Sequence, residues 1–386
     1  LDTIPKINSF VTRHTKYMSG KENFEVNVNT EIGRLRKLLI HSPDSGLGKV
    51  VPSKAQDWLF EDIVHLDTIR KDEYDYYTKL LMYFLDPEKI KGKYEAITDP
   101  GLLESIPEWL QKLGSKELGE KWEPEIHALN EEAEVVLRVN TLKTTRERLK
   151  NRLADDGINT YIVKGYPDAL ILEERQNVFR HPAFKEGLFE VQDASSQLVA
   201  AALAVEPGMR VIDACAGAGG KSLHLAALME NKGKVISMDV EEWKLQQAKL
   251  RARRNGVSIF EPKVIEGTKT IKRLKESADR LLLDVPCSGL GVLRRNPDTK
   301  WKLSLESIEK VQQTQQEILQ TYPSMLKKGG QLVYATCSIL PSENELQVKK
   351  FLESEAGKEF ELIEDKKVLA QESGFDGFYI ARLRKK

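Results

Sequence analysis

Three short apolar runs in the C-terminal half of the chain end at residues that can take part in chemistry. The first leads from Val211 into a glycine-rich turn, the second from Leu281 to Cys287, and the third from Leu332 to Cys337. Unbroken apolar runs of this length are typical of strands buried on both faces of a parallel sheet. Since open α/β sheets bind ligands at the carboxyl ends of their strands, the turn and both thiols are expected at one sheet edge.

The order of elements in residues 191–386 predicts the fold class. Strand patterns alternate with helical patterns at the spacing of βα units. The strands are expected at residues 210–214, 234–239, 263–266, 280–285, 330–336 and 377–383. Right-handed crossovers between such strands produce a doubly wound, Rossmann-like α/β sheet.

The chain length of 386 residues leaves room for two or three domains. Residues 94–190 are expected to hold a helical lead-in and a small α/β subdomain, ahead of the doubly wound domain at 191–386. The subdomain is expected to alternate strand, helix and strand at residues 134–139, 144–155 and 160–163. Residues 1–93 form a third region, whose helical stretch at 67–85 ends at Asp86-Pro87.

Charge and cysteine content narrow the classes of function. The 59 Lys and Arg residues balance the 59 Asp and Glu residues, so no net charge draws the whole chain to nucleic acid. Basic clusters at 251–254, 272–273 and 294–295 are candidates for phosphate contact, with a solvated helix face as the alternative. Three cysteines argue against a disulfide framework and favour a reducing compartment, the cytoplasm.

The sequence indicates neither a membrane segment nor a metal site. No run of about 18 apolar residues predicts a transmembrane helix, and the N-terminus shows no basic-then-apolar signal segment. The three cysteines and six histidines have neither Cys-x-x-Cys nor His-x-x-x-His spacing. A bound zinc ion is therefore not expected.

The turn from Asp213 to Lys221 predicts a cofactor site. Its glycines let the backbone approach a ligand, and the helix that follows offers free N–H groups at its N-terminus. The next strand ends in Asp239, an acid placed as ribose recognition requires. The turn matches neither Gly-x-Gly-x-x-Gly nor the Walker pattern, which favours a cofactor without a phosphate load, such as S-adenosylmethionine. A turn without a ligand is the alternative, and packing alone accounts for Cys215.

Two thiols and an acid suggest addition and elimination on a pyrimidine. A thiolate that adds to C6 of cytosine turns C5 into a nucleophile towards a methyl group. Asp284, three residues before Cys287, is placed to hydrogen-bond N3 of the base. The second thiol can assist the loss of the C5 proton and the release of the product. Two inert buried cysteines are the alternative interpretation.

These residues resemble the RNA (cytosine-5)-methyltransferases of the RsmB/Nop2/Sun type over roughly residues 95–386. The matching segments are 137–143, 187–197, 213–221, 284–289, 329–338, 343–345 and 374–379. The resemblance implies that Cys337 is the nucleophile, that Cys287 assists product release, and that Asp284 borders both base and cofactor. It also implies an S-adenosylmethionine site made of Cys215, Ala216, Gly217, Ala218, Gly219, Gly220, Lys221, Asp239, Thr268 and Asp284.

The chain departs from this family in three places. Ala218 stands where the family usually has proline, and Thr268 lies where an aspartate near the adenine is usual. The helical RNA-binding domain common in members that act on ribosomal RNA is not seen. Instead, residues 1–93 resemble the start of an arginine deiminase or amidinotransferase-like protein, without a complete active site.

The expected function is therefore S-adenosylmethionine-dependent methylation of cytosine C5 in RNA, with ribosomal RNA preferred over tRNA as the substrate. The protein is expected to act as a monomer in the cytoplasm. A non-catalytic RNA-binding or ribosome-assembly factor with the same fold is the first alternative. A DNA cytosine methyltransferase is the second, although that chemistry typically uses the Pro-Cys thiol as nucleophile and needs no second cysteine.

Overall fold

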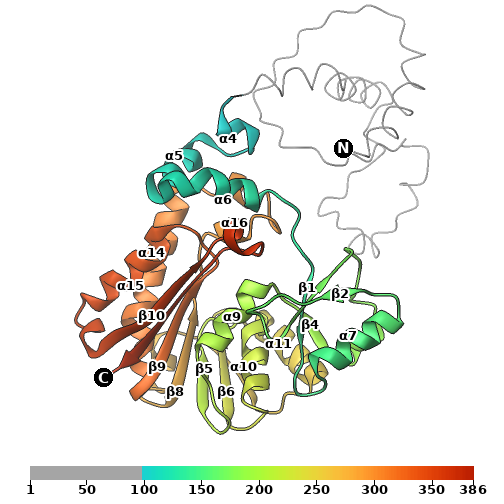
Figure 1. Ribbon diagram of the computed structural model, residues 1–386. Coiled ribbons are helices and arrows are strands. Elements are labelled where there is room, and N and C mark those ends of the chain that lie inside the picture. Colours follow the sequence, from blue (N-terminus) through green and yellow to red (C-terminus); the bar gives the residue numbers. More distant parts are fainter. Residues whose placement is uncertain (1–97) are drawn as a thin grey trace, which may run out of the picture. The chain divides into compact units, whose positions relative to one another are not determined.

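The computed structural model describes residues 98–386, drawn in colour in Figure 1. The chain divides into two compact units, Leu1–Ser105 and Ile106–Lys386. In the first unit, the described part holds the short helix α4 (Pro100–Leu103), which Asp99 caps at its N-terminus. The deiminase-like fragment expected at residues 1–93 lies outside the described residues, as does its expected helix at 67–85.

A seven-stranded sheet organises the unit Ile106–Lys386, in the order β10-β11-β9-β8-β5-β6-β7. Its strands are β5 (Arg210–Asp213), β6 (Lys234–Asp239), β7 (Phe260–Val264), β8 (Ala278–Asp284), β9 (Leu326–Thr336), β10 (Phe360–Val368) and β11 (Phe378–Lys385). The strands from β5 to β9 pair in parallel. Because β6 and β7 lie on one side of β5 while β8 and β9 lie on the other, the strand order reverses at β5 and β8, where such sheets bind ligands.

This arrangement confirms the expected doubly wound, Rossmann-like fold, with two corrections. The expected last strand is β11, and it runs antiparallel to β9 rather than parallel. It does so because it forms a hairpin with β10, a strand that the sequence analysis did not predict. The centre of β10 is exposed and rich in charge, as suits an edge strand, so it lacks the apolar run by which the other strands were recognised.

Two hydrophobic cores cover the two faces of this sheet, because neighbouring strand residues point to opposite faces. Leu281 and Leu283 of β8 belong to one core, while Leu282 belongs to the other. The first core includes α12 (Thr268–Lys272), α14 (Leu305–Thr321) and α15 (Glu345–Leu352). The second includes α9 (Ala194–Ala202), α10 (Gly220–Leu228) and α11 (Glu242–Asn255), which Figure 1 shows grouped together in the lower centre of the view.

A second sheet of four antiparallel strands, in the order β2-β3-β1-β4, precedes the large one in the sequence. Its strands are β1 (Val136–Val139), β2 (Thr160–Tyr161), β3 (Ala169–Leu172) and β4 (Phe189–Val191). The helices α7 (Arg146–Asp155) and α8 (Pro182–Lys185) accompany it. The sequence analysis predicted β1, α7 and β2 but missed β3 and β4, although β3 is an apolar run as long as β1.

A helical lead-in comes before the small sheet. It consists of α5 (Glu108–Leu118) and α6 (Trp122–Leu129), which share a core with residues of the C-terminal half. Glu125 of α6 is buried and accepts hydrogen bonds from the backbone N–H groups of Ala370 and Gln371, at the start of α16 (Ala370–Ser373). The remaining described helix, α13 (Thr299–Lys302), precedes α14.

Candidate active site

The two thiols expected at the sheet edge meet there. Cys287 follows β8 and Cys337 follows β9, two adjacent parallel strands in which Asp284 is opposite Ala335. Their Sγ atoms lie 3.0 Å apart, and both cysteines are free and partly buried. The backbone N–H of Cys337 also donates to Sγ of Cys287 at 3.3 Å. The two thiols therefore lie in direct contact at one position on the sheet edge.

The protonation of Cys287 follows from this contact. Its hydrogen bond with Cys337, followed by burial, raises the pKa of the Cys287 thiol well above its ordinary value. Cys287 therefore remains a neutral thiol at neutral pH and can donate its proton to the sulfur of Cys337.

Asp284 and Lys221 form an ion pair beside the thiols. Nζ of Lys221 donates to Oδ2 of Asp284 at 2.7 Å and lies 5.4 Å from the ring centre of Phe378. Burial opposes the positive charge, but Asp284 and the nearby sulfur of Cys337 outweigh it and raise the pKa of Lys221. A permanent positive charge thus lies close to both an acid and a thiol.

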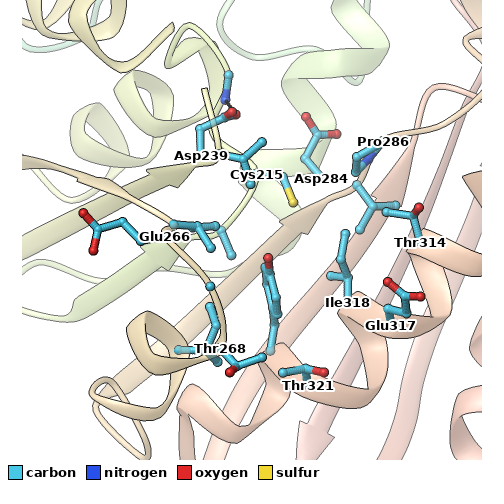
Figure 2. Close-up of a pocket in the computed structure, with 18 of the residues that line it drawn as sticks. Cys215, Asp239, Glu266, Thr268, Asp284, Pro286, Thr314, Glu317, Ile318 and Thr321 are labelled. Atoms are coloured by element: carbon cyan, nitrogen blue, oxygen red, sulfur yellow. Dashed lines mark hydrogen bonds between the residues drawn. The ribbon is translucent and has the colours of Figure 1, made fainter. Parts of the chain in front are cut away.

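Asp284 also lines a cavity of about 690 Å³ (Figure 2). Figure 2 shows Asp239 and Cys215 along one side, Glu266 and Thr268 along another, and side chains of α14 facing them. Among the residues expected to bind the cofactor, those that line the cavity are Cys215, Gly217, Asp239, Thr268 and Asp284. The cavity thus joins the ends of β5, β6 and β8, as the fold predicts.

The other residues expected to bind the cofactor are not among the cavity-lining residues: Ala216, Ala218 and Gly219 lie in the turn, and Gly220 and Lys221 begin α10. Two of the turn's glycines have positive φ, 52° at Gly217 and 81° at Gly219. A Cβ on Gly219 would lie 2.8 Å from Cβ of Ala248, so α11 leaves room only for glycine there. The backbone N–H of Gly217 donates to Oδ2 of Asp239 at 2.8 Å and ties the turn to the acid.

One wall of the cavity was missed by the sequence analysis. It consists of Thr314, Glu317, Ile318 and Thr321 of α14 together with Tyr322. Burial, with Cys215 and Asp239 nearby, raises the pKa of Tyr322 to about 12, so its hydroxyl stays protonated. The spacing of residues 314, 318 and 321 places them on one helix face. That pattern is visible in the sequence, but it does not reveal what the face covers.

The cavity fits a nucleoside-bearing cofactor. Its volume lies within the range of about 300–1,000 Å³ that is usual for small-molecule sites. Each carboxylate oxygen of Asp239 accepts one backbone N–H, from Gly217 and Glu241, and keeps a lone pair for a ribose hydroxyl. Val240, Ile265 and Ile271 supply apolar surface for a flat ring. The cavity thus offers an acceptor for a ribose hydroxyl and an apolar surface for the adenine ring of S-adenosylmethionine.

The arginine clusters considered for phosphate contact mostly have partners within the protein. Glu190 of β4, 3% exposed, accepts hydrogen bonds from Arg251 and Arg254. Arg251 also donates to the carbonyl of Ala218 at 2.8 Å, and so braces the turn. Arg295 pairs with Asp193 and Asp376, and Arg294 donates to backbone carbonyls. Arg253 and Arg295 are nevertheless exposed, as are Lys272 and Arg273, so the expectation of open cationic patches is corrected only for Arg251, Arg254 and Arg294, which are partly buried against internal partners.

Within residues 98–386, no cluster of three or more His, Cys, Asp or Glu side chains is suited to hold a metal ion. In the same part of the chain, none of the helices is both long and apolar enough to span a bilayer.

Comparison with known proteins agrees with the fold. The sequence profile of a family described as 16S rRNA methyltransferase RsmB/F matches residues 200–384, and that of the RsmF/B-like ferredoxin-like domain matches residues 106–179. A probable ribosomal RNA small subunit methyltransferase B from Synechocystis is 35% identical over 300 residues, which is 73% of this chain and 67% of the relative. Ribosomal RNA small subunit methyltransferase B from Escherichia coli is 38% identical over 287 residues, 72% of this chain and 66% of the relative.

A solved structure shows the same similarity. A methyltransferase homologue from Pyrococcus horikoshii superposes with a TM-score of 0.66 at 28% identity and covers 75% of this chain and 98% of that protein. The chain spans about two thirds of the length of the two curated relatives. With its doubly wound sheet and its matching sequence, the chain belongs to the RsmB/F family of methyltransferases.

Proposed function

We propose that this chain transfers a methyl group from S-adenosylmethionine to C5 of cytosine in RNA, and that the RNA is ribosomal. The contact between Cys287 and Cys337, beside Asp284 at the mouth of the cofactor cavity, carries the proposal. Electron-rich atoms accept a methyl group without help, whereas C5 of cytosine must first be activated by a nucleophile at C6. The curated relatives are named for ribosomal RNA, which supports that substrate and a cytoplasmic location.

Cys337 is the proposed nucleophile. Its thiolate forms a bond to C6 and shifts the electrons of the C5–C6 double bond towards C5. The charge of Lys221 lies near this sulfur. Asp284, held in place by Lys221, is the proposed partner of N3, where a shared proton stabilises the adduct.

S-adenosylmethionine, when bound, supplies the electrophilic methyl group that C5 takes. The C5 proton then leaves to water, the C5–C6 double bond re-forms, and the bond between C6 and Sγ of Cys337 breaks. Cys287, a neutral thiol 3.0 Å from the departing sulfur, is the proposed donor that stabilises it. Asp239, Cys215, Gly217 and Thr268 are the proposed contacts of the cofactor within the cavity.

The region 94–190 is proposed to contact the RNA. Tyr161, Ile162 and Phe179 are exposed there, at 37%, 36% and 56% of their surfaces. RNA-binding modules commonly stack unpaired bases on exposed aromatic side chains. The rings of Phe179 and Phe184 meet edge to face at 5.2 Å, which supports the exposed ring from below.

A direct assay tests this function. The full chain is incubated with S-adenosylmethionine labelled in the methyl group and with total RNA from a source that lacks the modification, and the RNA is digested to nucleosides. Label in 5-methylcytidine within the ribosomal fraction supports the proposal, and label confined to tRNA overturns the choice of RNA. Cofactor binding without any labelled nucleoside would leave an assembly factor as the better description.

A further inference from the structure

One buried carboxylate joins the two cysteine loops. Glu343, at the end of the 3-10 helix Pro341–Glu343, has no exposed surface. Its Oε1 accepts hydrogen bonds from the hydroxyls of Ser288 at 2.5 Å and Ser338 at 2.6 Å. Its Oε2 accepts from the backbone N–H of Ser288 at 2.8 Å and from Nε2 of Gln315 at 3.1 Å. The two serines directly follow Cys287 and Cys337, so Glu343 connects the residues next to both thiols.

The next residue holds the loop of Cys337 from both sides. Nδ2 of Asn344 donates to the carbonyl of Ser338 at 2.9 Å, and the hydroxyl of Thr336 donates to Oδ1 of Asn344 at 2.5 Å. Asn344 is 1% exposed. In addition, the hydroxyl of Tyr334 donates to the backbone carbonyl of Glu343 at 2.7 Å, which connects Glu343 and Asn344 to β9.

This arrangement needs a carboxylate. Four donors point at the two oxygens of Glu343, two at each oxygen. An ionised carboxylate offers about four acceptor sites and no donor, so it can satisfy all four. A glutamine would turn an N–H₂ group towards two of these donors, and at least one loop would have to move.

We propose that Glu343 and Asn344 form a latch, a pair of positioning residues that keeps the sulfur atoms of Cys287 and Cys337 in contact. The catalytic consequence rests on the proposed function, because only that reaction uses both thiols. The contact between the two sulfur atoms does not depend on the proposed function, since their separation can be tested without RNA.

The geometric test uses phenylarsine oxide, which forms two As–S bonds with a close pair of thiols and releases water. In the full chain, bridging of Cys287 and Cys337 is followed by intact mass. Glu343→Gln is expected to slow bridging about tenfold, because effective concentration falls steeply when reacting atoms are misplaced by about 1 Å. Reaction of each thiol with the monofunctional reagent N-ethylmaleimide should change by less than about threefold.

Two further variants keep the test decisive. Glu125→Gln changes another buried carboxylate that accepts backbone N–H groups but contacts neither cysteine loop, and it should bridge at the wild-type rate. Ser338→Ala removes one donor and leaves the carboxylate in place, so it is expected to slow bridging in a chain that still folds. Wild-type bridging in folded Glu343→Gln would overturn the proposal, and if that variant does not fold, wild-type bridging in Ser338→Ala would do the same.

The catalytic test follows RNA methylation. Glu343→Gln is expected to lower kcat about a hundredfold and to leave the KM for S-adenosylmethionine within about threefold, because the latch lies outside the cofactor cavity. Normal kcat with slow bridging would show that the latch sets the geometry without serving the reaction, and would overturn its catalytic part. If the wild-type protein methylates no RNA, the proposed function fails while the bridging result still decides the geometry.

Discussion

Cys287 and Cys337 are 50 residues apart in the sequence, yet their sulfur atoms lie 3.0 Å from each other. The parallel pairing of β8 with β9 places the ends of the two strands side by side, so the residues that follow each strand also lie close together. Cys287 is kept neutral by its neighbour and by burial, which suits a proton donor better than a nucleophile. The two thiols are therefore expected to have different roles in the reaction.

Removing each thiol should stop the reaction at a different point. Cys287→Ala is expected to accumulate a covalent complex with RNA, because the departing sulfur loses its donor. Cys337→Ala and the double variant should form no complex, since the bond to C6 is never made. Denaturing gels with labelled RNA measure the complex. A complex that persists in the double variant would assign the nucleophile to another residue.

Replacing Lys221 should impair the chemical step. Lys221→Met leaves Asp284 without its 2.7 Å partner and removes the charge near Cys337. The expected fall in kcat is about a hundredfold, in the range usual for loss of a positioned acid or base. Single-turnover methylation measures it directly. Lys232→Met, which removes an exposed pair with Glu230, is the control and should keep full activity.

Cofactor affinity should depend on Asp239. Asp239→Ala removes the proposed acceptor for a ribose hydroxyl and also the contact that holds Gly217. The dissociation constant for S-adenosylmethionine is expected to rise about tenfold to a hundredfold, as for loss of a hydrogen bond to a charged group. Calorimetry measures this without RNA. Glu241→Ala removes a nearby carboxylate that bonds Trp243 instead, and an equal loss of affinity in that variant would argue against a specific role for Asp239.

Stability should depend on pH through Asp213. Burial raises the pKa of this carboxyl to about 7 in the folded chain, against 3.8 for the free side chain. The folded state therefore holds the proton more tightly, and the free energy of unfolding falls as pH rises between these two values. Asp213→Asn removes this dependence and should be more stable than the wild type at pH 8, by up to about 4 kcal/mol. The two proteins should have similar stability near pH 4.

Urea unfolding at both pH values measures this difference. Asp279→Asn is the matched comparison with the opposite sign, because contacts with Lys327 and the backbone of Arg210 outweigh burial and lower the pKa of Asp279. Its ion pair stabilises the folded chain above the unfolded pKa, so this variant should be less stable than the wild type at pH 8. If Asp213→Asn were instead less stable than the wild type at pH 8, the folded chain would have to stabilise the charged carboxylate of Asp213, which would contradict this prediction.

Local patterns in the sequence determined much of the framework. The apolar runs before Asp213, Cys287 and Cys337 identified β5, β8 and β9, because strands buried on both faces need apolar side chains on both. The end of each strand located the turn and both thiols. The strand β10 escaped prediction since an edge strand need not be apolar. The strands β3 and β4 were also missed, although β3 is as long as β1, which was predicted.

Only the tertiary structure decided which side chains meet. Nothing near Glu343 in the sequence shows that the serines after both cysteines converge on it, and nothing near α14 shows that it closes the cofactor cavity. Arg251, Arg254 and Arg295 look like free cations in the sequence, but they serve as internal partners of Glu190, Asp193 and Asp376. Residue type and periodicity decide which segments become strands and helices, whereas partners across the fold depend on how those segments pack, which no local pattern encodes.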